Sequence, residues 1–290
     1  MSLLRLVGLS LGAVRAVYPS WLEVRQARRH PTGPDGIIAG AGAIDLEAAG
    51  SDRAVLLIHG CGDSPQVMAG LAKHMHSRGF SVRAPLLAHH GRAVEEMHRY
   101  AFAEWREQVR GELDALRARH AWVGVAGISM GGALALGLAV ERPDIPALVI
   151  FAPWVEMPEV YRLLARTSHH WSILAPYLPS LGADSIHDPI AAREALSHGM
   201  VTPASLRALH VAADLAQSAL PQVRTPTLVM QSRQDNRVSV GAADAAFAKL
   251  GAPDKRFVWL DDAGHVITVD FGKERVFSLT SEWMESHRGA

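Results

Sequence analysis

Residues Gly127-Ile128-Ser129-Met130-Gly131 match the pattern G-x-S-x-G, and their flanks predict a β-strand that turns sharply into an α-helix. Residues 122–126 are short and apolar like a buried parallel strand, and residues 132–140 are rich in Ala and Leu like a buried helix. So tight a turn leaves no room for a Cβ atom two positions before or after the serine, which explains both glycines. The turn would lift the Ser129 hydroxyl out of the sheet to meet a substrate carbonyl. The alternative is a glycine-rich helix start without chemistry.

Two side chains later in the chain could activate this serine. A serine hydroxyl needs a base within hydrogen-bond reach and a group that orients the base. Asp235 and His265 each follow a late strand-like run directly, in the order that such a serine requires, where sites of open α/β sheets form. We therefore predict Ser129 as nucleophile, Asp235 as orienting acid and His265 as general base. Asp261 and Asp262 lie too close in sequence to His265 to reach its far nitrogen easily and are interpreted as loop-capping residues.

The segment His59-Gly60-Cys61-Gly62 follows an apolar run and is the candidate for an oxyanion hole. Its glycines permit a backbone path that points an N–H group to where negative charge develops. The backbone N–H groups of Cys61 and Met130 are the predicted pair of donors. We expect His59 to brace this loop through hydrogen bonds rather than to act as a second base. The Cys61 side chain is expected to line the pocket rather than to serve as a reactive thiol.

Strand-like and helix-like runs alternate from about residue 37, which predicts an α/β fold with a mostly parallel central sheet flanked by helices. Residues 36–46 are predicted to form an early strand or hairpin. The alternation stops at residue 153, and the next 70 residues are too long for a simple loop. We therefore predict a small helical cap over 153–222, inserted after the sixth strand, and a core formed by 36–152 and 223–290.

The cap carries several large side chains that could cover a substrate. The candidates for substrate binding are Trp154, Tyr161 and Trp171 in the cap, together with Val266 next to the predicted base. The alternative for the aromatic residues is packing within the cap itself.

The composition excludes some classes of function. Lys+Arg and Asp+Glu balance at 29 each, so the chain lacks the net positive charge typical of nucleic-acid-binding proteins. Its 15 histidines are scattered and, with the single Cys61, show no spacing typical of a zinc site, so we expect no metal. One cysteine cannot form an intramolecular disulfide, which favours a reducing compartment and a cytoplasmic location.

Residues 1–35 lie outside the alternating pattern and are predicted to be a helical extension. Residues 6–14 are apolar and bracketed by Arg5 and Arg15, too short a run to span a bilayer. Three interpretations stay open: a helix docked on the protein, peripheral contact of residues 1–30 with the inner membrane, and a weak signal peptide without a clear cleavage site.

At this point the chain resembles the serine α/β-hydrolase superfamily over residues of about 37–287, and more narrowly the bacterial carboxylesterase and monoacylglycerol lipase group. The segments that carry the resemblance are 54–60, 127–132, 202–209 and Gly264-His265-Val266-Ile267-Thr268-Val269-Asp270. The resemblance implies the same triad, the same two oxyanion donors and no cofactor. The chain departs from the group at Cys61, where an apolar or aromatic residue is usual, and at Gly62-Asp63-Ser64, where a turn rich in Thr or Ser often follows.

These observations together predict a serine hydrolase that cleaves carboxylic esters of short to medium acyl chains through an acyl-enzyme on Ser129. Its substrate would be a small-molecule ester or a monoacylglycerol. The alternatives are a monoacylglycerol lipase or lysophospholipase acting at a membrane surface, and a thioesterase or C–C bond hydrolase, because these activities need the same triad.

Overall fold

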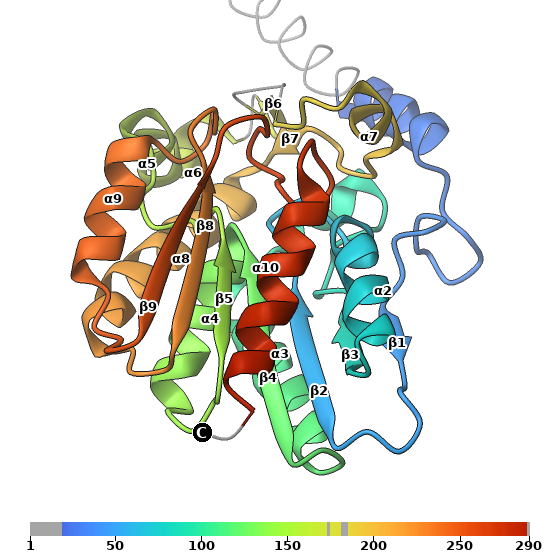
Figure 1. Cartoon of the computed structure of the whole chain (residues 1–290). Helices are drawn as coiled ribbons and strands as arrows, with labels where there is room; N and C mark the ends of the chain where they lie inside the picture. The colour runs from blue at the N-terminus through green and yellow to red at the C-terminus, as the bar shows by residue number, and fades with distance from the viewer. Residues whose placement is uncertain (1–18, 173–174, 181–184, 289–290) are drawn as a thin grey trace, which may run out of the picture.

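A computed structural model describes residues 19–172, 175–180 and 185–288 of the chain. Its centre is a seven-stranded sheet with the strand order β1-β3-β2-β4-β5-β8-β9 (Figure 1). β1 runs antiparallel to β3, and the other neighbouring strands pair in parallel. The strands are β1 (Ile44–Leu46), β2 (Arg53–Ile58), β3 (Ser81–Ala84), β4 (Trp122–Ile128), β5 (Leu148–Phe151), β8 (Thr227–Ser232) and β9 (Lys255–Leu260). The α/β-hydrolase fold that the sequence predicts is confirmed.

Helices cover both faces of the sheet, because successive residues of its central strands point to opposite sides. In β2, Leu56 and Ile58 face the cluster formed by α3, α4, α8 and α9, whereas Val55 and Leu57 face α2 and α10. All four side chains are fully buried, which explains why the strand is apolar throughout rather than alternating. The helices are α2 (Ala69–Ser77), α3 (Phe102–Arg117), α4 (Met130–Glu141), α8 (Pro203–Ala219), α9 (Val240–Lys249) and α10 (Lys273–Ser286), with the 3₁₀ helices η1 (Pro65–Met68), η2 (Val94–Arg99) and η3 (Leu220–Gln222).

The insertion between β5 and β8 has two parts. The first carries α5 (Glu159–Arg166), α6 (Ser168–Trp171), β6 (Leu178–Pro179), α7 (Pro189–Glu194) and β7 (Met200–Val201), and β6 pairs antiparallel with β7. The second is α8, which packs along α4 and helps to cover the sheet. We therefore propose a cap over 153–201, shorter than the sequence suggests, with α8 as part of the core.

The insertion follows the fifth strand of the described chain, not the sixth as the sequence predicts. The cause is segment 36–46, which contributes only the short strand β1 to the sheet and forms no hairpin there. An isolated bridge between Thr32 and Ile38 is the other strand-like contact of this region.

Residues 19–29 are helical and lie beside the cap. Gln26 attaches this helix to the chain before β7, because its side-chain amide donates a hydrogen bond of 3.2 Å to the backbone carbonyl of His198. The apolar run at 6–14 lies outside the described residues. Within the described residues, no helix has the length and apolar character needed to cross a membrane.

Candidate active site

Ser129 occupies a strained turn between β4 and α4. Its backbone has φ 55° and ψ −119°, a conformation that a residue with a side chain adopts only where its surroundings enforce it. Two hydrogen bonds hold the turn: the N–H of Ser129 donates to the carbonyl of Phe151 (2.9 Å), and the N–H of Trp154 donates to the carbonyl of Ser129 (3.0 Å). The local geometry thus fixes the serine at the end of a central strand.

The two glycines of the pattern are required because backbone passes directly against them. A Cβ atom on Gly127 would overlap the carbonyl oxygen of Gly131, and one on Gly131 would overlap that of Ile58. Neither contact can be relieved by moving a side chain. The steric explanation that the sequence offers for G-x-S-x-G is confirmed.

Asp235 and His265 meet in the loops after β8 and β9. His265 Nδ1 lies 2.8 Å from Oδ2 of Asp235, and both side chains are almost fully buried. The carboxylate also accepts hydrogen bonds from Gln231 Nε2 (2.7 Å) and from the backbone N–H groups of Arg237 (2.7 Å) and Val238 (3.0 Å). Burial opposes ionisation of Asp235, but the charge of His265 and these donors outweigh it and lower the pKa. Asp235 is therefore an ionised acceptor for His265 at neutral pH.

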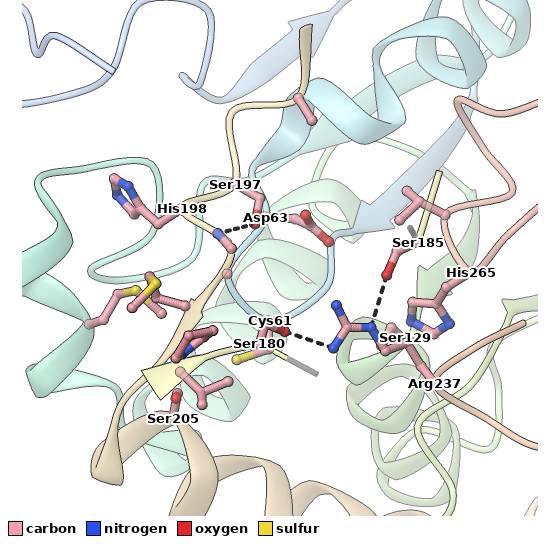
Figure 2. A pocket seen from close by; sticks show the side chains of 18 of the residues that line it. Cys61, Asp63, Ser129, Ser180, Ser185, Ser197, His198, Ser205, Arg237 and His265 are labelled. Carbon is pink, nitrogen blue, oxygen red and sulfur yellow. Dashed lines mark hydrogen bonds between the residues drawn. The ribbon is translucent and has the colours of Figure 1, made fainter. Parts of the chain in front are cut away.

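Ser129 and His265 line one cavity of about 630 Å³. Figure 2 shows the two side chains beside each other, with the Arg237 side chain next to them and directed towards Ser180. Only 8% of Ser129 and 7% of His265 is exposed, so the cavity is their access to solvent. The structure thus brings together the three residues that the sequence selects for the triad.

The loop after β2 passes directly beside the nucleophile. A Cβ atom on Gly60 would lie 3.4 Å from Cβ of Ser129, and Cys61 lines the cavity. Met130 begins α4, where a backbone N–H has no acceptor within the helix and the helix dipole favours negative charge. The N–H groups of Cys61 and Met130 therefore belong to segments that flank the Ser129 side chain.

His59 fixes this loop through both of its ring nitrogens. Nε2 accepts a hydrogen bond from the backbone N–H of Leu87 (3.1 Å), so Nδ1 carries the proton and donates to the carbonyl of Gly60 (2.8 Å). Burial lowers the pKa of His59 to about 4, which the hydrogen bond to Gly60 only partly offsets. This neutral, doubly bonded ring is arranged to brace the loop, as the sequence analysis expects, and has no nitrogen left for a proton transfer.

Of the other predicted pocket residues, all but Trp171 line the cavity. Trp154, Tyr161 and Val266 line the cavity with Cys61, whose thiol pKa is raised by burial and by the charge of Asp63. Trp171 is absent from the described lining, and its indole N–H donates to the carbonyl of Leu164 within the cap (3.0 Å). For Trp171 the structure favours the alternative, packing within the cap.

Two charged residues of the cavity, Asp63 and Arg237, have no predicted role from the sequence. The Asp63 carboxyl has its pKa raised to about 6 by burial, against the opposing charges of His265 and Arg237. Arg237 crosses the cavity to the cap, where it donates to the hydroxyls of Ser185 (2.9 Å) and Ser180 (2.7 Å) (Figure 2). The available signal is their position, because Asp63 directly follows the predicted oxyanion loop and Arg237 lies two residues after the predicted acid.

Asp270 is a third charged residue without a predicted role; it does not line the cavity but connects the His265 loop to the cap. Its fully buried carboxylate accepts four backbone N–H groups: Oδ2 from Gly264 (2.7 Å) and His187 (2.8 Å), and Oδ1 from Asp188 (2.8 Å) and Phe271 (2.8 Å). The sequence analysis uses Asp270 only as part of a resemblance. Its spacing of five residues after the predicted base was the signal for a role.

The described residues offer no group of three or more His, Cys, Asp or Glu side chains that could hold a metal ion. The polar groups of the cavity are instead arranged for proton transfer and for hydrogen bonding. A nucleophile, a base with a fixed tautomer and backbone donors are the requirements of acyl transfer.

Comparison with known proteins identifies relatives that align with most of the chain. Residues 49–271 match the family described as serine aminopeptidase, S33. The chain is 29% identical over 249 residues to the thermostable monoacylglycerol lipase of Bacillus sp. (strain H-257), an alignment that covers 86% of this chain and 97% of that protein. It is 25% identical over 239 residues to a carboxylesterase of Bacillus subtilis (strain 168), covering 81% of this chain and 94% of the relative.

A solved structure from the work on the metagenome-derived lipolytic enzymes LipS and LipT superposes with a TM-score of 0.79 at 25% identity. The superposition covers 87% of this chain and 100% of that one. The family match extends from just before β2 to just past Asp270, so it includes every residue of the cavity that the sequence analysis selects.

Proposed function

The chain belongs to the serine aminopeptidase S33 family of α/β-hydrolases, and on that premise we propose that it is a serine hydrolase that cleaves carboxylic esters through an acyl-enzyme on Ser129. The observation that carries the proposal is the 2.8 Å contact between His265 and the ionised Asp235, at the wall of a cavity that Ser129 also lines. The monoacylglycerol lipase and the carboxylesterase among the relatives support an ester as substrate.

In the first half of the reaction, Nε2 of His265 takes the proton of Ser129 while the serine oxygen attacks the ester carbonyl. Asp235 accepts the Nδ1 proton of His265, which keeps the reactive tautomer and stabilises the imidazolium. The backbone N–H groups of Cys61 and Met130 donate to the oxyanion of the tetrahedral intermediate. His265 then protonates the leaving alcohol.

In the second half, water repeats the sequence on the acyl-enzyme. His265 takes a proton from the water as it attacks the acyl carbonyl, and returns it to Ser129 as the carboxylic acid leaves. We place the acyl chain in the buried apolar part of the cavity, which suits chains of short to medium length. The side chains that line this part are Met97, Trp154, Val201 and Leu209.

The aminopeptidase in the family's description is a weaker candidate for this chain. An aminopeptidase must receive a free ammonium group close to the scissile bond. Arg237 lies beside Ser129, and Asp63 is the single carboxylate in the described part of the lining (Figure 2). Because like charges repel at short range, this cavity favours a neutral or anionic substrate.

Labelling with a fluorophosphonate probe and a p-nitrophenyl ester series, run beside monoacylglycerol and a thioester, tests the proposal. We expect the probe to modify Ser129, and Ser129→Ala to lose at least about 10⁴-fold in kcat. Ser278→Ala is the matched control, because this exposed serine of α10 lies outside the cavity, and its activity should stay within about twofold. Folded protein that leaves Ser129 unlabelled would overturn the proposal. A labelled protein that cleaves only the thioester would move the substrate to that class.

A further inference from the structure

The cavity changes in character from its interior to its mouth. Its interior is apolar, because Met97, Trp154 and Leu209 are each less than one-tenth exposed. Its mouth is formed in part by the helix of residues 19–29, where Trp21 is 54% exposed. An amphiphilic substrate would therefore place its chain inside and its polar part at this helix.

The polar part would meet positive charge. Arg25 and Arg29 of this helix are exposed and line the mouth, and Arg237 lines the cavity beside Ser129. The structure pairs neither Arg25 nor Arg29 with a carboxylate among the described residues; the Arg25 guanidinium instead lies 5.4 Å from the ring centroid of Trp21. Both guanidinium groups are thus available to a ligand.

Arginines outnumber carboxylates among the described residues that line the cavity. Glu23, on the same helix, accepts a hydrogen bond from the Tyr177 hydroxyl (2.9 Å) and is not part of the described lining. The lining has three arginines and one described carboxylate, that of Asp63. At His198 on the cavity wall, burial lowers the pKa, the charge of Glu95 raises it, and the charge of Arg29 lowers it by less than Glu95 raises it.

We propose that the substrate is a monoacyl ester whose alcohol part carries an anionic group, and that Arg25 and Arg29 bind this group at the mouth of the cavity. The inference rests on the proposed ester hydrolysis at Ser129 and extends it to the class of alcohol. The leaving alcohol must depart towards solvent, so the anion belongs on the alcohol and not on the acyl chain. Guanidinium groups bind phosphate and carboxylate alike through paired N–H donors, and either anion satisfies the site.

Three esters with the same hexanoyl chain test this inference: hexanoylglycerol, hexanoylglycerol phosphate and the hexanoyl ester of glycolate. All are used below their critical micelle concentrations and at low ionic strength, so that attraction to a lipid surface plays no part. We expect kcat/KM to be about tenfold higher for an anionic ester than for the neutral one, the size expected for two partly screened ion pairs. The anion with the larger preference identifies the headgroup.

The variant Arg25→Gln/Arg29→Gln should lower the ratio of anionic to neutral kcat/KM about tenfold, and added salt should do the same. Arg28→Gln is the matched control, because Arg28 is exposed on the same helix but does not line the cavity. If Arg28→Gln lowers this ratio equally, the inference is overturned, because the preference would then come from the overall positive charge of the helix and not from binding by Arg25 and Arg29. It is also overturned if the neutral ester is cleaved as well as the anionic esters. If the probe labels Ser129 and the neutral ester is cleaved without a preference for the anionic esters, only this inference fails and the proposed ester hydrolysis stands. If no ester is cleaved, both the inference and the proposed function fail.

Discussion

The two walls of the cavity differ in how the chain builds them. One wall consists of turns at the ends of β2, β4, β8 and β9, which carry Cys61, Ser129, Asp235 and His265. The other consists of the cap and the helix of residues 19–29, which carry Trp154, the serines that contact Arg237, and Arg25 and Arg29. The first wall is fixed by parallel strands and holds the chemical groups. The second is irregular and holds groups suited to recognising a substrate.

The largest expected effect lies within the strand-end wall. Asp235→Asn should lower kcat by about 10³- to 10⁴-fold on p-nitrophenyl butyrate, because an amide facing Nδ1 would favour the wrong tautomer of His265. Asp261→Asn is the matched control. This exposed acid is the alternative partner in sequence, but its side chain lies 3.3 Å from Arg233 and not at His265. A comparable loss in Asp261→Asn would show that the acid is misassigned.

The next effect lies where the two walls meet, at Asp270. In Asp270→Asn one carboxylate oxygen becomes an NH₂ group that faces backbone N–H donors, so we expect the free energy of unfolding to fall by about 4 kcal/mol. Because Gly264 loses its acceptor, kcat should fall as well, and we expect KM to rise since His187 and Asp188 belong to the cap. Urea denaturation and steady-state kinetics measure both changes.

Asp262→Asn provides the comparison for Asp270, because Asp262 is an exposed acid of the same loop. Its unfolding free energy should stay within about 0.5 kcal/mol of the wild type. If Asp270→Asn unfolds as the wild type does, the two walls are held together by other contacts, such as the hydrogen bond from Val266 N–H to the carbonyl of Ser185 (3.0 Å).

The strand-end wall was largely predictable from the sequence and the cap wall was not. A residue that follows an apolar strand has its place set by the register of the sheet, so Ser129, Asp235 and His265 could be located from the order of runs alone. For Arg237 the sequence indicates the loop but not the direction of the side chain, because Arg237 points to Ser180 and Ser185 in an irregular part of the chain. Trp171 shows the same limit: an aromatic residue within a cap has no periodic pattern to tell its inner from its outer face.

The proposed end of the cap differs from the predicted one for a related reason. Helix α8 begins with a capping box at Thr202 and buries a stripe of small and aliphatic side chains, features that suit a cap helix and a sheet-covering helix equally well. Only its packing against α4 decides between the two.

The smallest effect concerns acid stability, and it comes from the histidines behind the strand-end wall. Burial lowers the pKa of His59 to about 4, and lowers that of His90, 4.9 Å away between ring centroids, well below its usual value. In the unfolded chain both histidines have a pKa of about 6.5. Their neutral forms therefore stabilise the fold fully above that pH, and the contribution is lost as the pH falls towards 4.

For His59 the loss amounts to about 3 kcal/mol, and protonation of His90 destabilises the fold in the same direction. Asp63 acts in the opposite direction. Its pKa is about 6 in the folded protein but only about 4 in the unfolded chain, so the folded protein binds this proton first as the pH falls, and that binding stabilises the fold. This gain in the free energy of unfolding is about 3 kcal/mol and offsets the loss that His59 causes. Since His90 adds to the loss from His59, we expect a net fall in the free energy of unfolding between pH 6.5 and 4, measured by urea denaturation at several pH values. In Asp63→Asn, which lacks the offset, the fall should be steeper. A wild-type profile that is flat over this range would mean that His59 and His90 are solvated, and the loop that they brace would then be less rigid than its two hydrogen bonds imply.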